Sequence, residues 1–429
     1  MQQLVRGAKR LGGTVAPPGD KSISHRALIF NALANGEARV SNLAPGGDCR
    51  STLRCLRALG VRIEPAVEDG VVVVRGAHVH GLREPQDVLH AGNSGTTMRL
   101  LSGGLAGQPF LSVLTGDSSL RSRPMGRLIE PLRLMGAHIS GRQGGTLPPL
   151  VIQGREIQGI TYTLPVASAQ VKSALLLAGL LARGDTVVIQ PAVSRDHTER
   201  MLRAMGCSLE EDGLTVRIRP GQPAALDVEV PGDLSAAAFW LVAGAAHPQA
   251  KIRITDTGVN PTRCGVLEVL EAMGARVVVE NHRLQGGEPV ADLVVESSQL
   301  QGVEVRGPLI ARVVDELPVL AVAACFARGT TVIRDAGELR VKESDRIATT
   351  VRELARLGAQ VEELPDGMII RGTGQLTGSR CRSHGDHRLA MALGVAAILA
   401  RGETVIQGAQ AASVSYPAFW EHLRQLSLG

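Results

Sequence analysis

Aromatic residues are the scarcest class in this chain of 429 residues, since Phe, Trp and Tyr together make up 2% of it. Proteins that bind single-stranded nucleic acid stack bases on aromatic rings, so this scarcity argues against such a ligand. Ala, Leu, Val and Gly must fill the core instead, which favours helices packed closely through small side chains. Hydrophobic residues still make up 44% of the chain, enough for two or three domains.

Long apolar runs are also absent. The longest, at residues 174–182 and 389–400, fall short of the roughly 20 residues that a membrane helix needs. Residues 1–13 are polar and lack the apolar segment of a signal peptide. The six cysteines form no Cys-x-x-Cys pair. We therefore expect a cytoplasmic protein with reduced, structural thiols and no membrane contact.

What the chain does contain is a repeat of about 70 residues. In each copy a helix-like run closes on Leu or Met before Gly, and the chain then restarts as a strand. The copies lie at residues 56–63, 132–139, 202–209, 270–277 and 354–361, and a truncated sixth lies at 423–426. Each glycine stands where a helix needs a left-handed C-cap. The chain is therefore read as six copies of one folding unit.

A second series interleaves with the first, because each copy also holds an Ala/Leu-rich helix that follows polar residues. These helices are predicted to start at residues 20–22, 92–94, 168–170, 232–234, 315–317 and 385–387. Short apolar strands follow at residues 38–40, 186–189, 251–254, 330–333 and 404–406. The period is too long for a solenoid of small repeats, so packed duplicated domains of the α/β class are predicted.

The net charge of +5 is modest, but the placement of the cations is informative. Many of them stand at or near predicted helix starts: Lys21, Arg26, Arg121, Arg123, Arg195, Lys342, Arg346 and Arg388. A helix N-terminus already presents unpaired N–H groups and partial positive charge, so added cations there make anion sites. The pattern indicates small, highly anionic ligands.

Five motifs resemble one enzyme family. They are Pro-Gly-Asp-Lys-Ser-Ile-Ser-His-Arg (18–26), Gly-Asn-Ser-Gly-Thr-Thr-Met-Arg (92–99), Arg-Ser-Arg-Pro-Met (121–125), Arg-Val-Lys-Glu-Ser-Asp-Arg (340–346) and Gly-Asp-His-Arg (385–388). Together they resemble the signatures of 5-enolpyruvylshikimate-3-phosphate synthases. The resemblance runs in the same order from about residue 13 to the C-terminus.

The resemblance implies an α/β (α+β) fold of two lobes, each built from three βαβαββ units. The C-terminal lobe is expected to hold residues 1–17 plus 233–429, and the N-terminal lobe residues 18–232. Hinge crossings are expected near residues 17–19 and 231–232, where Pro and Gly gather. The lobes of this family close on their substrates, so hinge motion is implied as well.

The implied activity is that of a transferase of the shikimate pathway, in chorismate and aromatic amino acid biosynthesis. It moves the enolpyruvyl group of phosphoenolpyruvate to the 5-hydroxyl of shikimate 3-phosphate and releases phosphate by addition and elimination. No organic cofactor or metal is implied. We expect a monomer whose partners are these two small molecules, and not nucleic acid.

The resemblance also assigns residues to the two substrates, which are both anionic and need a cationic pocket. Those assigned to phosphoenolpyruvate are Lys21, Gly95, Arg123, Gln170, Arg346 and Arg388. Those assigned to shikimate 3-phosphate are Lys21, Ser22, Arg26, Ser168, Ala169, Gln170, Arg195, Asp315 and Lys342. Asp315 is the expected base towards the hydroxyl, and Glu343, alone or with Lys21, the expected proton donor to the methylene carbon.

The chain departs from many relatives at two places. Ala169 stands where they carry a second serine, which leaves a backbone contact at that position. Residues 413–417 contain no lysine, whereas many relatives have one there that reaches phosphoenolpyruvate. Gly95 leaves room for the phosphonate analogue glyphosate, so glyphosate-type inhibitors are candidate ligands.

Three other interpretations remain open at this point. A sister transferase puts enolpyruvyl onto UDP-N-acetylglucosamine, but its loop typically carries a cysteine that residues 117–123 lack. Related βαβαββ units occur in RNA-end-processing proteins, which would predict salt-dependent RNA binding. A metal site at His384, Asp386 and His387, or at Asp196 with His197, lacks a convincing third ligand.

Overall fold

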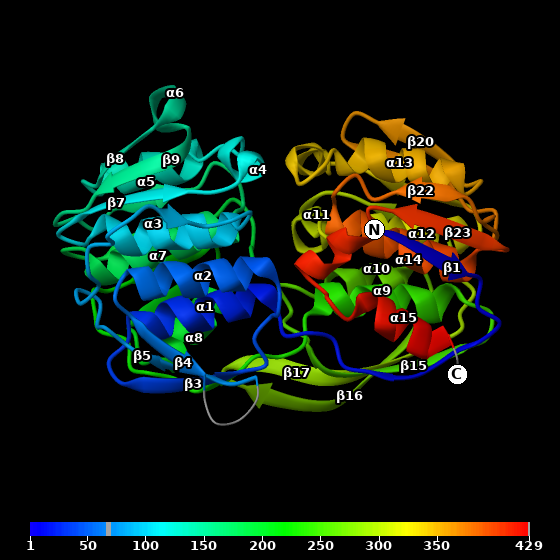
Figure 1. Ribbon diagram of the computed structural model, residues 1–429, viewed down its shortest axis with the longest axis horizontal. Helices are drawn as coiled ribbons and strands as arrows, with labels where there is room; N and C mark the ends of the chain where they lie inside the picture. Colours follow the sequence, from blue (N-terminus) through cyan, green and yellow to red (C-terminus); the bar gives the residue numbers. More distant parts are fainter. Residues whose placement is uncertain (66–69, 428–429) are drawn as a thin grey trace. The chain divides into compact units, whose positions relative to one another are not determined.

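The computed structural model describes residues 1–65 and 70–427 (Figure 1). The chain forms two compact units. Unit 1 comprises Met1–Pro18, Pro231–Leu284 and Pro289–Gly429, and unit 2 comprises Gly19–Val230 and Gln285–Glu288. The expected end of the C-terminal lobe, at residue 429, lies outside the described residues. None of the described helices is long and apolar enough to cross a membrane.

The described part of unit 2 contains three four-stranded sheets of one pattern, in which a parallel pair is followed by two antiparallel strands. The first, β14-β3-β5-β4, comprises Val228–Glu229, Glu37–Ser41, Val72–Arg75 and Arg62–Pro65. The second, β6-β7-β9-β8, comprises Leu89–His90, Leu111–Thr115, Leu147–Gln153 and His138–Gly141. The third, β10-β11-β13-β12, comprises Thr161–Thr163, Thr186–Ile189, Thr215–Ile218 and Leu209–Asp212.

The remaining three described sheets belong mainly to unit 1. The sheet β16-β17-β15-β2 comprises Arg276–Gln285, Glu288–Glu296, Ala250–Gly258 and Leu11–Val15. The sheet β18-β19-β21-β20 comprises Glu304–Val305, Thr330–Ile333, Gly367–Arg371 and Gln360–Leu364. The last, β1-β23-β22, comprises Gln2–Arg6, Glu403–Gln407 and Arg380–Arg382. The predicted six βαβαββ repeats are thereby confirmed, and the truncated sixth copy has three strands.

Each repeat sheet is covered by helices. Unit 2 holds α1 (Lys21–Ala32), α2 (Gly47–Ala58), α3 (Gly95–Ala106), α4 (Ser118–Arg121), α5 (Gly126–Leu134), α6 (Arg142–Gly145), α7 (Ala169–Leu181) and α8 (His197–Ala204). Unit 1 holds α9 (Leu234–Ala246), α10 (Gly265–Ala272), α11 (Pro308–Val313), α12 (Leu317–Phe326), η1 (Gly337–Val341), α13 (Arg346–Arg356), α14 (His387–Leu399), η2 (Ala409–Val414) and α15 (Phe419–Ser427).

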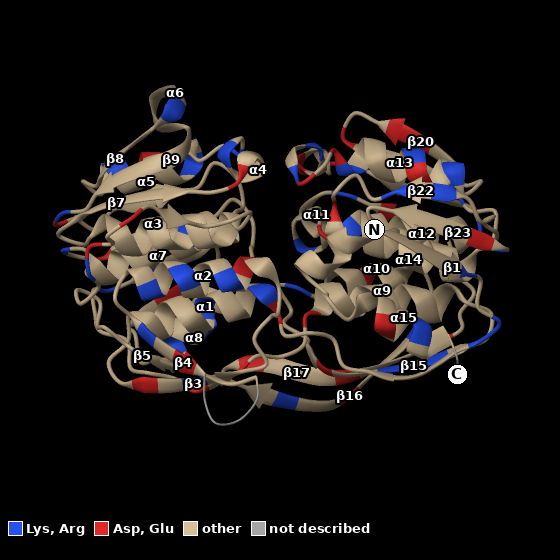
Figure 2. Ribbon diagram, in the orientation of Figure 1, with Lys and Arg blue, Asp and Glu red and all other residues tan. Residues whose placement is uncertain are grey.

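One helix per repeat is buried on almost all sides. In unit 1 these helices are α9, α12 and α14, each of which contacts the other two, and in unit 2 α3 contacts both α1 and α7. Figure 2 draws α9 and α12 without a charged residue along their length. A helix that is apolar all round must lie in a core. Close approach needs small residues: a Cβ on Gly103 of α3 would lie 2.1 Å from the carbonyl oxygen of Ala174 on α7.

The repeat glycines have the predicted conformation. All five have positive φ, namely Gly60 (87°), Gly136 (101°), Gly206 (79°), Gly274 (81°) and Gly358 (85°). In each copy the residue after the glycine donates its N–H to the carbonyl five residues earlier, as Val61 does to Leu56 at 3.1 Å. This is the Schellman cap, so the repeated Leu/Met-Gly pattern ends a helix five times by the same mechanism.

Candidate active site

Three helix starts in unit 2 carry predicted binding residues, and a polar N-cap fixes each start. Asp20 accepts a hydrogen bond from the Ile23 N–H (2.9 Å) at α1. Ser94 accepts one from Thr97 (3.1 Å) at α3, and Ser168 one from Val171 (3.4 Å) at α7. The caps place Lys21, Gly95 and Ala169 as the first residues of their helices. Ser168, Ala169 and Gln170 are all half-buried there.

Lys21 and Arg26 both lie in the first two turns of α1. Lys21 Nζ is 3.2 Å from Asp48 Oδ2 of α2, and both side chains are largely buried. The carbonyl of Ser22 accepts a hydrogen bond from Arg26 Nη1 at 2.9 Å. The structure therefore brings all three predicted residues of this motif to the first turns of one helix.

Arg26 is buried among neutral oxygens. Its Nε donates to Thr198 Oγ1 and its Nη2 to Ser173 Oγ, both at 2.7 Å. Burial lowers the pKa of Arg26 to about 10, and the positive charge of Arg195 also lowers it, while Glu199 opposes the shift. Arg26 therefore stays charged at neutral pH. The influence of Arg195 also places this predicted cation, which precedes α8, close enough to act on Arg26.

Gly95 lies beside two guanidinium groups. A Cβ there would lie 2.6 Å from Arg99 Nη1 and 3.6 Å from Arg123 Nη1. Arg99 Nη1 also donates to Gln170 Oε1 at 2.6 Å, and Gln170 Nε2 donates to Thr96 Oγ1 at 2.9 Å. Gln170 of α7 is thus tied to the first turn of α3, and a side chain at residue 95 would displace Arg99.

Arg123 follows α4 and is held by uncharged groups. Its Nη2 donates to Asn93 Oδ1 at 2.6 Å and lies 3.4 Å from Ser119 Oγ. Asn93 in turn donates through Nδ2 to Asp117 Oδ2 at 2.7 Å, and the other oxygen of Asp117 caps α4. The amide of Asn93 therefore orients Arg123 without cancelling its charge.

Arg346 is the centre of the unit 1 residues. It is 1% exposed and pairs with three carboxylates: its Nη1 is 3.4 Å from Asp315 Oδ1, its Nη2 2.5 Å from Glu343 Oε2, and its Nε 2.8 Å from Asp386 Oδ2. Burial alone would lower the pKa of Arg346, but these three carboxylates together raise it well above its ordinary value. The guanidinium is permanently charged.

The two predicted proton-transfer groups, Asp315 and Glu343, are therefore joined through one cation. The side chain of Asp315 is 22% exposed and that of Glu343 24%, whereas Arg346 lies beneath them at 2%. Both carboxyl groups are therefore accessible to a ligand while each contacts Arg346. The arrangement suits proton transfer at two points of one ligand pair.

Asp386 organises the start of α14. Its Oδ1 accepts hydrogen bonds from the N–H groups of Arg388 (2.8 Å) and Leu389 (3.4 Å), and Ser344 Oγ donates to its Oδ2 at 3.1 Å. Burial would raise the pKa of Asp386, but the charge of Arg346 outweighs burial and lowers it. Asp386 thus fixes both predicted phosphoenolpyruvate arginines of this unit, Arg346 by its side chain and Arg388 by its backbone.

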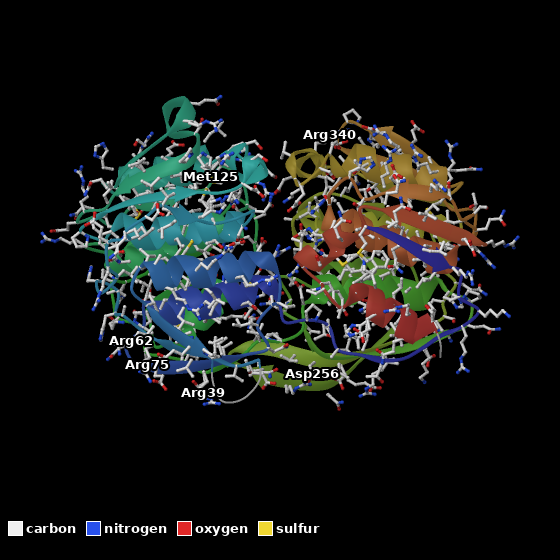
Figure 3. The ribbon with its side chains drawn as sticks, in the orientation of Figure 1. Arg39, Arg62, Arg75, Met125, Asp256 and Arg340 are labelled. Atoms are coloured by element: carbon white, nitrogen blue, oxygen red, sulfur yellow. The ribbon has the colours of Figure 1, made fainter. Side chains whose placement is uncertain are left out.

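The segment with Lys342 and Glu343 is anchored by Arg340 (Figure 3). Arg340 Nη1 donates to Asp345 Oδ2 at 2.8 Å, its Nη2 to the Leu364 carbonyl at 2.7 Å and its Nε to the Pro365 carbonyl at 2.6 Å. Lys342 Nζ lies 2.7 Å from Glu338 Oε1, one turn earlier. Lys342 is thus paired with an exposed carboxylate of η1.

Several residues that the sequence analysis did not assign take part in these clusters. They are Arg99, Asn93, Asp386, Glu316 and Arg263. Three of them belong to motifs that were already identified in the sequence. Asn93 and Arg99 belong to the 92–99 motif, and Asp386 belongs to the 385–388 motif. Glu316 follows Asp315 directly. Arg263 lies in no recognised motif, and only the fold connects it to Glu316.

The two candidate metal sites have other partners. His384 Nε2 lies 2.8 Å from Glu353 Oε1, and Asp386 binds Arg346. His197 Nδ1 lies 2.8 Å from Glu288 Oε1. Within residues 1–65 and 70–427, no group of three or more His, Cys, Asp or Glu residues is placed to hold a metal ion.

Comparison with known proteins connects these clusters to one family. The profile of a family described as EPSP synthase (3-phosphoshikimate 1-carboxyvinyltransferase) matches residues 5–423. A protein of Herpetosiphon aurantiacus named 3-phosphoshikimate 1-carboxyvinyltransferase is 55% identical over 430 residues and covers 99% of both chains. One of Gloeobacter violaceus with the same name is 56% identical over 421 residues, which are 98% of this chain and 97% of the relative.

Solved structures agree with the sequence relatives. A 2.37 Å structure of EPSP synthase from Acinetobacter baumannii superposes with a TM-score of 0.90 at 43% identity. It covers 99% of this chain and 98% of that one. A second structure from the same organism gives a TM-score of 0.89 at 41% identity. The similarity extends over both units.

Proposed function

The chain belongs to the EPSP synthase family, and from this premise we propose which of its residues perform the reaction. The enzyme transfers the enolpyruvyl group of phosphoenolpyruvate to the 5-hydroxyl of shikimate 3-phosphate, in aromatic amino acid biosynthesis. A new C–O bond forms at the central carbon of phosphoenolpyruvate, and the C–O bond to phosphate breaks. The alternative transfer to UDP-N-acetylglucosamine is not favoured by any of these relatives.

Phosphoenolpyruvate is assigned to guanidinium groups of both units and to the small or polar residues beside them. In unit 2 these are Arg123, held by Asn93, together with the small Gly95. Lys21 and Gln170 complete that set, and Arg346 and Arg388 are the contribution of unit 1. Planar guanidinium groups bind carboxylate and phosphate through two parallel hydrogen bonds, which supports this assignment.

Shikimate 3-phosphate is assigned to the starts of α1 and α7 and to the residues that flank them. Ser168, Ala169 and Gln170 offer a hydroxyl, a backbone N–H and an amide in the first turn of α7. Arg26 and Arg195 add positive charge, and Lys21, Ser22, Asp315 and Lys342 complete the set. With no serine hydroxyl at Ala169, Arg195 is the residue that supplies the missing anion contact.

Two protons move in this proposal. Asp315 accepts the proton of the 5-hydroxyl as its oxygen attacks, and Glu343, with Lys21 as a second candidate, gives a proton to the methylene carbon. The tetrahedral intermediate then loses a methyl proton and phosphate, which restores the double bond. The observation that carries this assignment is the single buried cation, Arg346, that holds both carboxylates.

The testing experiment is phosphate release from the purified enzyme with phosphoenolpyruvate and either shikimate 3-phosphate or UDP-N-acetylglucosamine. We expect release with shikimate 3-phosphate alone. Release with the nucleotide sugar alone would contradict the substrate, and release with neither would contradict the activity. Asp315→Asn in the same assay separates the residue assignment from the reaction itself.

We also propose that the enzyme is a cytoplasmic monomer with no nucleic-acid partner. The few aromatic residues offer no stacking surface for bases, and the six cysteines, all unpaired with one another, suit a reducing compartment. Light scattering should give a mass near 45.1 kDa. A mass near twice that value would contradict the monomer.

A further inference from the structure

Glu316 is a buried carboxylate directly after the predicted base Asp315. Its side chain is 1% exposed, and its Oε1 lies 3.2 Å from Arg263 Nη1 and accepts a short hydrogen bond from Ser235 Oγ. The same oxygen is 3.8 Å from Arg388 Nη1. The other oxygen, Oε2, is buried and accepts no hydrogen bond from any described residue. The carboxylate of Glu316 is thus shared between two arginines, and its Oε2 can still accept a hydrogen bond.

Arg263 links Glu316 to a second carboxylate, that of Asp233. Its side chain is 4% exposed, and its Nη2 lies 3.1 Å from Asp233 Oδ1 and donates to Ser235 Oγ at 2.5 Å. Two cations, Arg263 and Arg388, therefore face two carboxylates, Asp233 and Glu316. Removing one member of such a buried group leaves a net charge that nearby solvent cannot screen well.

Arg388 is the member of this group that faces substrate in the proposed function. It is 7% exposed, and Glu316 is its one ion-pair partner among the described residues. A separation of 3.8 Å is too long for a hydrogen bond, so Glu316 affects Arg388 mainly through its charge. The guanidinium consequently retains donors for a ligand, while a nearby negative charge lowers its attraction for anions.

We propose that Glu316 is a positioning residue for phosphoenolpyruvate binding: its carboxylate, shared between Arg263 and Arg388, sets the positive charge that Arg388 offers to this substrate. The inference rests on the proposed assignment of Arg388 to phosphoenolpyruvate. Glu316 need not touch the substrate. It limits the affinity for phosphoenolpyruvate and thereby favours its turnover and the departure of phosphate.

The test changes the two charged neighbours of Arg388 in opposite directions. Glu316→Gln keeps the shape and the hydrogen bond to Ser235 but leaves one extra positive charge. The KM for phosphoenolpyruvate should fall about tenfold, and inhibition by inorganic phosphate should strengthen by a similar factor. Arg263→Gln leaves one extra negative charge, so the same KM should rise about tenfold. The KM for shikimate 3-phosphate should change less than twofold in both.

The double variant Glu316→Gln/Arg263→Gln restores the balance, so the KM for phosphoenolpyruvate should return to within about threefold of the parent value. It also keeps the proposal testable if one single variant fails to fold. Glu353→Gln is the matched control, because this equally buried carboxylate of unit 1 pairs with His384 and Arg356. It should lower stability with no change in either KM.

The outcomes separate the inference from its premise. An unchanged or raised KM for phosphoenolpyruvate in Glu316→Gln overturns the role of Glu316. If Arg388→Ala also leaves that KM unchanged, the assignment of Arg388 fails first. If Arg388→Ala raises it at least tenfold while Glu316→Gln has no effect, the assignment holds and the inference alone fails.

Discussion

The arginines near the candidate site in unit 2 and in unit 1 donate hydrogen bonds to different kinds of group. Arg26 donates to two hydroxyls and a carbonyl, Arg123 to an amide and a hydroxyl, and Arg99 to the amide of Gln170. In unit 1, Arg346 pairs with three carboxylates, and Arg263 with two. Both units contain guanidinium groups. The acceptors of their hydrogen bonds named here are uncharged for the unit 2 arginines and are carboxylates for the unit 1 arginines.

A neutral partner fixes the direction of a guanidinium without offsetting its charge, so the group is prepared for an anion. A carboxylate partner offsets the charge, which stabilises the buried cation and places carboxyl oxygens beside it for proton transfer. The comparison therefore predicts that substitution of Arg123 in unit 2 mainly changes substrate affinity. Substitution of Arg346, Asp315 or Glu343 in unit 1 should mainly change turnover and stability.

The largest expected effect is on turnover, in Asp315→Asn and Glu343→Gln. Each keeps the shape of the side chain and removes a proton-transfer group, so kcat should fall by about 10²–10⁴. Steady-state rates of phosphate release measure this, with circular dichroism to show an intact fold. Glu338→Gln, which removes the exposed partner of Lys342, is the control and should retain most turnover. Near-normal kcat in either test variant would contradict its assigned role.

The next largest effect is the loss of stability of unit 1 in the variant Arg346→Ala. This change leaves Asp315, Glu343 and the fully buried Asp386 without their shared cation, so the free energy of unfolding should fall by about 3–5 kcal/mol. Both tryptophans, Trp240 and Trp420, belong to unit 1, so urea unfolding followed by tryptophan fluorescence reports on it.

Arg123→Ala is the counterpart in unit 2, where the partners are neutral, and should cost less than about 1.5 kcal/mol of stability. Equal losses in the two variants would contradict the contrast between the units. Far-UV circular dichroism is the second probe, because unit 2 contains no tryptophan.

The fold could be predicted from sequence because its signals are local and repeated. A glycine after Leu or Met ends a helix through local backbone hydrogen bonds. At Gly60, for example, the N–H of the next residue, Val61, donates to the carbonyl of Leu56. The helix starts are also set by local hydrogen bonds, because the side chains of Asp20 and Ser94 each accept one from the N–H group three residues later. Such rules act within a few residues, so six copies could be aligned without knowing how they pack.

The partners of the site residues could not be predicted, because they come from distant segments. Arg263 reaches Glu316 across 53 residues, and Arg26 reaches Thr198 across 172. No local pattern records such pairs. The motifs identified which cations matter, and the assignments themselves stay predictions. The nature of each partner, neutral or acidic, became visible only in the fold.

A smaller effect is expected on substrate affinity in Arg123→Ala. Because Asn93 and Ser119 orient Arg123 without offsetting its charge, the KM for phosphoenolpyruvate should rise about 10–100-fold, while that for shikimate 3-phosphate changes less than threefold. Steady-state kinetics with each substrate varied in turn give both values. Arg127→Ala on the exposed face of α5 is the matched control and should change neither. Equal losses for both substrates would contradict the assignment of Arg123.

The last prediction contrasts the acid sensitivity of the two units. In unit 2, His25 Nδ1 lies 2.7 Å from Thr52 Oγ1, which in turn contacts Thr97 Oγ1 at 2.7 Å. Burial, together with the charges of Lys21 and Arg26, lowers the pKa of His25 from 6.5 to about 3, although the charge of Asp48 opposes this shift. In unit 1 the folded-state pKa of Asp386 lies below its ordinary 3.8, and burial lowers the pKa of His422 below its ordinary 6.5.

Whether stability rises or falls with pH depends on which state, folded or unfolded, binds more protons. Between pH 6.5 and about 3 the unfolded state protonates His25 and the folded state does not, so stability falls as the pH falls, by up to about 1.4 kcal/mol per pH unit. The stability due to Asp386 is present above pH 3.8 and is lost only below it. His25→Asn should therefore flatten the loss of stability between pH 6.5 and 4, measured by urea unfolding with circular dichroism. An unchanged slope would show that the acid sensitivity of unit 2 arises elsewhere than in its neutral hydrogen-bond chain.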